Sequence, residues 1–263
     1  LMGDGTATHG GFIVMEEAVM AIDSLTSPIL AQNFIQVIKK ASTKPIRYLV
    51  NTHFHGDHTF GNEFFPEARI LSHANCRREF LEAGETNIES IADGLPELAE
   101  DIRKVHLRPP DVTFVDRMTL YDGSRELRLL YLGPAHTFGD TLVYLPDERL
   151  LYAGDIAFLK VVPYAGDGYI SGWIRVIDEV EKLEVDRIVP GHGPIGTMAD
   201  LRELRDYFFI LRDEARRCYD SGMSEEEADR AVKVDKYRSW LGQEANRFGS
   251  ITQLYKEFRG EMR

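Results

Sequence analysis

The chain is poor in cysteine and has no long apolar run, and both absences narrow its class. Cys76 and Cys218 are its only cysteines, far apart and outside any CxxC pattern, which is typical of free thiols in a reducing compartment. No apolar stretch approaches the ~20 residues that a transmembrane helix requires. We therefore expect no membrane insertion and a cytoplasmic location. The residues after Leu1 show no basic segment followed by an apolar one, and a signal peptide that has already been removed is the alternative.

Basic residues are also in deficit, since 31 lysines and arginines face 43 aspartates and glutamates, for a net charge of −12. Nucleic-acid-binding proteins usually carry a basic stripe or patch, so we expect a small-molecule substrate and no nucleic-acid partner. With 263 residues and 43% hydrophobic content, the chain can bury a substantial core. We expect one domain, residues 1–263, with a helical C-terminal extension over residues 198–263. This extension could pack on the domain, shape a pocket or mediate a homodimer.

What the chain does contain is a cluster of metal-ligand side chains in residues 51–62, NTHFHGDHTFGN, directly after an apolar run. Alternate residues of extended backbone share a face, so a loop leaving a strand can aim His53 and His55 the same way. After a glycine, where the chain can turn freely, Asp57 and His58 present a second pair of ligands. Imidazoles together with a carboxylate suit zinc, and sometimes iron or manganese, better than calcium or magnesium.

The HFHGDH stretch resembles the HxHxDH signature of the metallo-β-lactamase superfamily. That superfamily places a further histidine, an aspartate and a final histidine later in the chain, in that order. His136 in GPAHTFGD, Asp155 in LLYAGD and His192 in IVPGHG stand in these places. Each follows a short apolar run and lies beside glycine or proline, as expected where strands pass into loops. The ligand pattern is therefore complete.

The resemblance implies a dinuclear site with two Zn²⁺ per chain, with iron or manganese as alternative metals. The ligands of the first metal would be His53, His55 and His136, and those of the second Asp57, His58 and His192. Asp155 would bridge the two metals. Such a pair of metals holds a bridging hydroxide that attacks the substrate. Asp57 would also be catalytic, taking up or passing on a proton.

Four further residues are candidates for supporting roles. Thr137 and Asp140 lie beside the first of the later histidines, where they could orient ligand imidazoles or could simply make turn and capping hydrogen bonds. Phe158 and Tyr164 follow the bridging aspartate and are candidates for the substrate pocket.

The aspartate at position 155 separates branches of the superfamily. True metallo-β-lactamases generally have cysteine or serine at the bridging position, or recruit another histidine, so Asp155 looks more like the glyoxalase II, lactonase and general hydrolase branches. The resemblance therefore implies a hydrolase of a small ester, thioester, lactone or amide, with a β-lactamase-type or phosphodiester hydrolase as an alternative. Two other classes stay open. One is an oxidoreductase resembling the persulfide dioxygenases, which share the HxHxDH frame but use one iron, and the other is a non-catalytic metal-binding or scaffold protein.

The rest of the sequence alternates strands with helices, which matches the α/β class and the αββα sandwich that the resemblance implies. Residues 11–23 predict a strand hairpin, and Ser27 before a proline predicts a helix start. Ser171 is predicted to cap a later helix. Residues 84–110 are polar and irregular and could form a lid or ordinary surface helices. His73 matches no position of the ligand pattern, so we expect a structural role for it, with support of a metal ligand as the alternative.

Overall fold

The computed structural model describes residues 7–262, apart from the side chains of residues 243–246 and 248. The chain divides into two compact units. The amino-terminal unit comprises residues 8–131 and 141–147, and the carboxy-terminal unit comprises residues 7, 132–140 and 148–262. Organisation as a single domain therefore stays a prediction.

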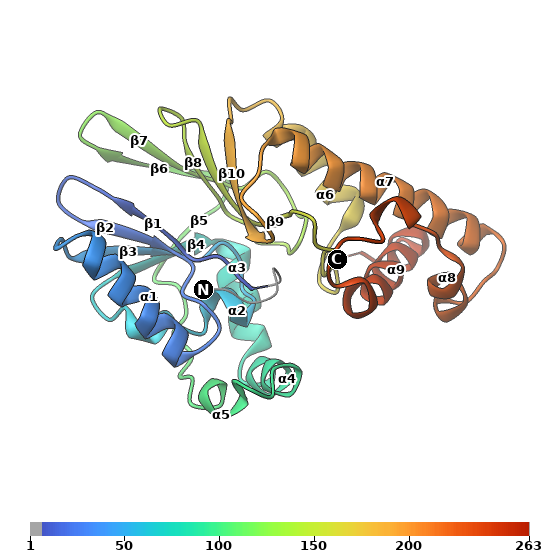
Figure 1. Ribbon diagram of the computed structural model, residues 1–263, viewed down its shortest axis with the longest axis horizontal. Helices are drawn as coiled ribbons and strands as arrows, with labels where there is room; N and C mark the ends of the chain where they lie inside the picture. The colour runs from blue at the N-terminus through green and yellow to red at the C-terminus, as the bar shows by residue number, and fades with distance from the viewer. Residues whose placement is uncertain (1–6, 263) are drawn as a thin grey trace. The chain divides into compact units, whose positions relative to one another are not determined.

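The amino-terminal unit is built on a five-stranded sheet of order β1-β2-β3-β4-β5 (Figure 1). Its strands are β1 (Gly11–Val14), β2 (Val19–Ile22), β3 (Ile46–Val50), β4 (Arg69–His73) and β5 (Val112–Phe114). β1 and β2 form the predicted antiparallel hairpin, whereas β2 to β5 run parallel. The carboxyl ends of the parallel strands therefore share one end of the sheet, and the metal-ligand loop follows β3 there.

Helix α1 (Pro28–Ala41) covers one face of this sheet, as Figure 1 shows. The Ser27 side chain caps the helix and a proline occupies its first turn, as predicted. Phe34 and Ile38 of α1 are buried in one cluster with Leu49 of the sheet. Burying an apolar side chain of this size contributes roughly 1.5–3 kcal/mol, so core packing as well as capping holds α1 on the sheet.

Residues 84–110 form short helices. Helix α3 (Ala74–Ala83) is followed by α4 (Thr86–Gly94) and α5 (Ala99–Ile102). Ile88, Ala92 and Ile102 are buried in one cluster with Phe60, which lies near the end of the metal-ligand loop. The segment therefore packs behind that loop, and its action as a lid stays a prediction.

His73, at the end of β4, has a structural role, as expected. One ring nitrogen accepts a hydrogen bond from the backbone N–H of Asn75 at the start of α3, and the other lies 2.7 Å from the carbonyl oxygen of Val115. The ring stacks on Tyr131 with 3.9 Å between centroids. Burial lowers the pKa of this imidazole. Its contacts thus join β4, α3 and the segment after β5.

Three antiparallel strands complete the amino-terminal unit: β6 (Arg117–Asp122), β7 (Arg125–Leu130) and β8 (Leu142–Leu145). Leu127 and Leu129 of β7 are buried and alternate with half-exposed neighbours, the pattern of a strand with one covered face. Between β7 and β8 the chain enters the carboxy-terminal unit for residues 132–140.

The carboxy-terminal unit contains the parallel strands β9 (Leu150–Phe158) and β10 (Arg187–His192), connected through α6 (Ile170–Val180). The buried residues of α6 include Trp173, Val176, Ile177 and Val180. The prediction that Ser171 caps this helix is wrong, because Tyr169 is the N-cap residue and Ser171 lies in the first turn. The capping oxygen atoms belong to Glu257, far along the sequence.

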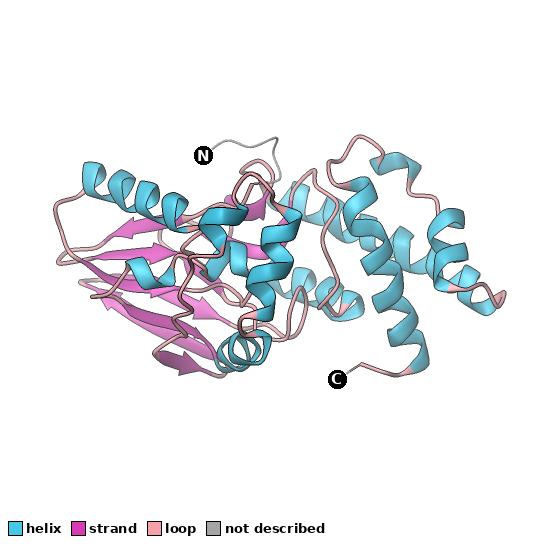
Figure 2. Ribbon diagram, turned by 90° about the horizontal axis from the view of Figure 1, so that it is seen from below, coloured by secondary structure: helices cyan, strands magenta, loops and turns pink. Residues whose placement is uncertain are grey.

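The end of the described chain is helical, which confirms the predicted C-terminal helical region. Its elements are α7 (Met198–Asp220), α8 (Glu225–Ala231), the short η2 (Asp235–Tyr237) and α9 (Gln243–Arg259), drawn as cyan coils in Figure 2. Capping boxes begin α7, at Thr197 and Asp200, and α8, at Ser224 and Glu227. Helix α7 contacts α6, α8 and α9. Within residues 7–262, no helix is both long and apolar enough to cross a membrane.

Candidate metal centre

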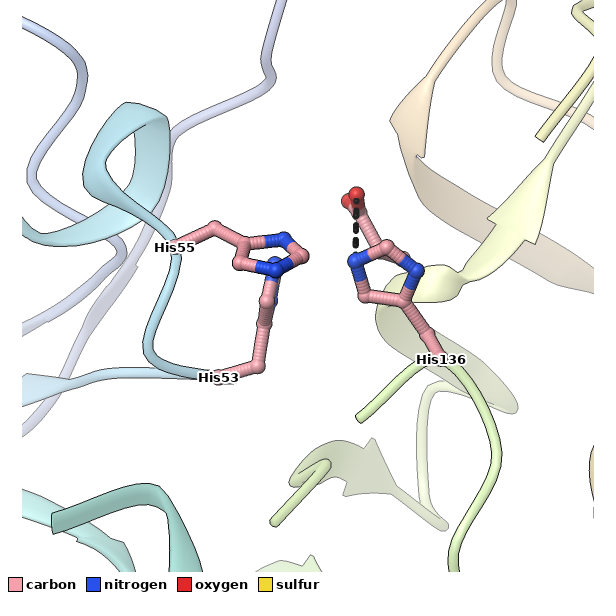
Figure 3. Close-up of side chains that lie close together, drawn as sticks. His53, His55 and His136 are labelled. Atoms are coloured by element: carbon pink, nitrogen blue, oxygen red, sulfur yellow. Dashed lines mark ion pairs between the residues drawn. The ribbon is translucent and has the colours of Figure 1, made fainter. Parts of the chain in front are cut away.

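Four of the predicted ligands lie together on the loop that follows β3 and on the single-turn helix α2 (Gly56–Thr59). The imidazoles of His53 and His55 project from the same side of the loop, as Figure 3 shows, with 4.7 Å between their centroids. The His58 ring lies 4.2 Å from that of His53. His53 and His58 are buried, whereas His55 and Asp57 are half-buried. The loop thus presents three imidazoles and a carboxylate as one group.

A buried carboxylate, Asp23, stands behind this group and orients one of its histidines. Its Oδ2 atom lies 2.7 Å from His58 Nδ1, and it accepts hydrogen bonds of 2.8 Å from the backbone N–H and the hydroxyl of Thr52. Burial raises the pKa of the Asp23 carboxyl, which these contacts act to lower. With its Nδ1 held in this way, His58 turns its Nε2 atom toward Asp57, 3.3 Å from the carboxylate. The sequence did not indicate Asp23, whose φ of 56° is in the left-handed region.

Two asparagines close the ends of the same loop. The side-chain amides of Asn51 and Asn62 bond reciprocally, at 3.0 Å and 2.9 Å, so that each donates to and accepts from the other. Ser24 also donates to Asn62, and Asn62 donates to the carbonyl oxygen of Arg108. A side chain at Gly61 would meet the Ser24 carbonyl oxygen at 2.1 Å, so glycine is required for this approach. The loop is therefore fastened at its start and at its end.

The other predicted ligands, His136, Asp155 and His192, lie together in the carboxy-terminal unit. Asp155 Oδ2 is 3.3 Å from His136 Nε2 and 3.3 Å from His192 Nε2, and the dashed line in Figure 3 marks the first of these pairs. All three are well covered, with side-chain exposures of 0% for His136, 3% for Asp155 and 13% for His192. One carboxylate oxygen therefore lies close to the Nε2 atoms of two imidazoles.

Two glycines, Gly191 and Gly193, let the backbone of β10 and the residue after it approach Asp155 and Leu159 closely. A Cβ atom at Gly191 would lie 1.8 Å from Asp155 Oδ1, so no other residue can occupy this position without a shift. Gly193 has φ of 93°, which only glycine adopts readily, and its Cβ position is 1.9 Å from the Leu159 carbonyl oxygen. The glycines on both sides of His192 thus fix where β10 places its histidine.

Aromatic rings surround the three residues. Phe158 stacks on His192 with 4.8 Å between centroids, and Trp173 meets His136 edge-on at 5.2 Å. Phe158, which we predicted for the substrate pocket, is itself 3% exposed, whereas Tyr164 is 41% exposed. The backbone oxygen of Tyr164 lies 3.1 Å from His136 Nδ1. The pocket roles of Phe158 and Tyr164 stay predictions, and each residue contacts a histidine of the predicted ligand set.

Thr137 and Asp140 shape the turn that carries His136. The Asp140 carboxylate accepts from the backbone N–H of Thr137 and from its hydroxyl, at 2.9 Å and 2.7 Å. Burial raises the pKa of Asp140 to about 7, against the effect of these bonds. These are turn hydrogen bonds, one of the two roles that the sequence suggested for Thr137 and Asp140. A role in orienting the ligand imidazoles stays a prediction.

The donor set fits transition-metal ions such as zinc. In three histidines the Nδ1 atom lies at hydrogen-bond distance from an oxygen atom. The oxygen belongs to the Thr52 hydroxyl for His53, at 3.1 Å, to the Asp23 carboxylate for His58, and to the Tyr164 carbonyl for His136. Such a contact fixes the ring and makes Nε2 the nitrogen that would bind a metal. Imidazole nitrogen and carboxylate oxygen are ordinary zinc ligands. These His and Asp side chains could therefore hold metal ions.

The chain belongs to the metallo-beta-lactamase superfamily, whose family model matches residues 4–192. This match confirms the resemblance drawn from the motifs. It also confirms the α/β sandwich fold with two sheets, to which the C-terminal helical region is added. That the chain is closer to the glyoxalase II and lactonase branch than to true β-lactamases stays a prediction.

Relatives of this chain differ in length and in the activity that they are named for. The 2,4-dinitroanisole O-demethylase subunit alpha of Nocardioides sp. (strain JS1661) is 30% identical over 96% of this chain and 73% of that protein. A linear primary-alkylsulfatase of Pseudomonas sp. (strain ATCC 19151) is 21% identical over 93% of this chain and 54% of that protein. The structure of the sec-alkylsulfatase Pisa1 from Pseudomonas sp. superposes with a TM-score of 0.78 at 17% identity, covering 98% of this chain and 48% of that one. The chain thus spans about half the length of these alkylsulfatases.

Proposed function

We propose that the two groups of ligands together form one dinuclear metal centre and that the protein is a metal-dependent hydrolase. His53, His55 and His136 would hold the first metal, Asp57, His58 and His192 would hold the second, and Asp155 would be shared between them. The observation that carries the proposal is the position of Asp155 Oδ2, at 3.3 Å from both His136 and His192. An oxygen shared between one ligand of each metal has the position that a bridging carboxylate needs.

The chemistry follows from this ligand set. In this ligand set, two bound zinc ions would supply an activated water as nucleophile and would stabilise negative charge on the substrate. Asp57 is the group that handles the proton, because its side chain is 27% exposed whereas that of His58 beside it is fully covered. The Thr8 hydroxyl donates to Asp57 Oδ2 and holds the carboxylate in position. A partly exposed, fixed carboxylate can exchange a proton with the substrate or with solvent.

The substrate is a small molecule with an ester, thioester, lactone or amide bond. The named activities of the relatives add two further bonds to the candidates. One relative is named for O-demethylation of 2,4-dinitroanisole, and the other for linear primary alkyl sulfates. Both names describe breaking a bond to an oxygen atom, that of an aryl methyl ether in the first case and that of a sulfate ester in the second. A substrate panel should therefore include these two compounds beside an ester, a thioester and a lactone.

Elemental analysis with a substrate panel tests the proposal. The protein is purified without added metal, and zinc, iron and manganese per chain are measured on the sample used for the assays. We expect close to two zinc ions per chain and turnover of at least one substrate. The Asp155→Ala variant should lose both the bound zinc and the turnover. Asp147→Ala, an exposed aspartate just before β9, is the matched control and should keep metal and activity. One iron per chain without hydrolysis would contradict the proposal and favour oxygen-dependent sulfur chemistry.

A further inference from the structure

Helix α9 carries polar side chains, among them Gln253 and Glu257, on the face that packs into the carboxy-terminal unit. Ser250, Ile251 and Leu254 on this face are fully buried, and Gln253 is only 6% exposed. Glu257 follows one helical turn later, so it lies on the same side as Gln253. Two polar groups four residues apart on a buried face must have partners, because an unmade hydrogen bond there is costly.

The partner of Glu257 is the amino terminus of α6. Tyr169, the N-cap residue of α6, makes no capping side-chain hydrogen bond within the described residues. The Glu257 carboxylate instead accepts from the backbone N–H of Ser171 at 3.3 Å and from the Ser171 hydroxyl, and the backbone N–H of Ile170 also bonds to it. The first N–H groups of a helix have no partner inside the helix, and a carboxylate at that end also favours the helix dipole. Glu257 therefore caps α6 from α9.

The partner of Gln253 is the loop between β9 and α6. Its side-chain amide donates to the carbonyl oxygen of Gly166. The chain just before α9 holds the start of the same loop, since Val162 N–H donates to the Leu241 carbonyl at 2.8 Å and Leu241 N–H donates to that of Lys160 at 3.2 Å. The loop is thus fixed at its beginning by residue 241 and near its end by Gln253.

The loop and α6 in turn contact the ring and the backbone around His136. The Tyr164 carbonyl in the loop lies 3.1 Å from His136 Nδ1, and Trp173 of α6 meets the ring. Tyr169 N–H donates to the Ala135 carbonyl at 2.7 Å. A side chain at Gly172 would lie 2.2 Å from the Pro134 carbonyl, so α6 packs directly on this turn. The two elements that Gln253 and Glu257 hold, the loop and the start of α6, therefore both touch the His136 turn.

We infer that α9 positions His136 for metal binding, with Gln253 and Glu257 as positioning residues that act through the 159–169 loop and the start of α6. The C-terminal helical region then has a part in the metal centre although it supplies none of the proposed ligands. The inference rests on the proposed function only in taking His136 as a ligand. The competing explanation is that α9 stabilises the whole unit without a specific effect on His136.

Hydrogen exchange on the metal-free protein separates the two explanations, and zinc affinity by chelator competition extends the test to the ligand. The variants are Glu257→Ala, which removes the cap, and Glu257→Gln, which keeps one acceptor oxygen for the α6 amides. Gln253→Glu keeps the shape but removes the donor. The control is Glu261→Gln, which alters an exposed carboxylate paired with Arg259 just beyond α9.

We expect amide exchange of residues 132–140 and 160–171 to rise by about tenfold in Glu257→Ala and Gln253→Glu, with residues 187–192 of β10 unchanged. Zinc affinity should fall by about 10- to 100-fold, the usual effect of removing a support behind a ligand. Glu257→Gln should recover part of both, and the control should match wild type. Exchange that rises equally in β10, or only within α9, would overturn the inference. Absence of zinc or of hydrolysis in wild type would count against the proposed function alone, because the exchange result does not depend on either.

Discussion

The two groups of candidate ligands are held by different kinds of contact. On the loop after β3, polar side chains do the holding: Asp23 orients His58, and the Asn51 and Asn62 amides close the loop. Around His136 and His192, aromatic rings pack on the imidazoles. Hydrogen bonds to an imidazole fix the orientation of the ring and the nitrogen that carries the proton. Aromatic packing fixes the position of the ring through the apolar area that it buries. Substitution of the carboxylate that orients His58 should therefore alter metal binding more than stability, and substitution of a ring packed on His136 or His192 should do the reverse.

Trp173→Ala should have the largest effect on stability. Trp173 is fully buried, meets His136 and Phe208, and donates from its indole N–H to the Ile156 carbonyl. Its removal leaves a cavity and an unpaired carbonyl, so we expect a loss of about 3–5 kcal/mol in the free energy of unfolding. Urea denaturation of the metal-free protein measures it. Trp173→Phe, which keeps a ring, should lose much less, and equal losses in the two variants would show that ring packing is not the support.

Asp23→Asn should affect metal binding more than stability. In this variant an amide NH₂ group takes the place of Oδ2 and donates to His58 Nδ1. This favours the His58 tautomer whose proton is on Nε2. That tautomer cannot ligate through Nε2. We expect zinc affinity to fall by about 10- to 100-fold, measured by chelator competition.

The same variant should change stability less than Trp173→Ala, because the amide keeps the shape and one acceptor for the Thr52 N–H. A stability loss as large as that of Trp173→Ala, with unchanged zinc affinity, would remove the distinction between the two groups. Asp147→Ala again serves as an exposed aspartate control.

The sequence could predict residues whose role depends on near neighbours. Ser27 and its proline cap α1 locally, and the HxHxDH spacing alone brings His53 and His55 side by side. Asp23 and Glu257 carry no such signal, because each bonds a partner 35 or 86 residues away. For the same reason the local pattern predicts Ser171 as the cap of α6, whereas the fold uses Glu257. Long-range polar contacts are created by the fold, and no local spacing encodes them.

A double-mutant cycle on Asn51 and Asn62 should show the smallest effect and sharpen the comparison. Each alanine variant removes a buried amide and leaves its partner with unmade hydrogen bonds, which costs about 1–2 kcal/mol of unfolding free energy. Because both variants break the same reciprocal pair, the double variant should lose about 1 kcal/mol less than the sum of the singles. Zinc affinity should change less than in Asp23→Asn, since the amide pair touches the ends of the loop and no imidazole. Strictly additive losses would mean that the two asparagines act separately, and the loop would then be held by contacts such as the Asn62 bond to Arg108.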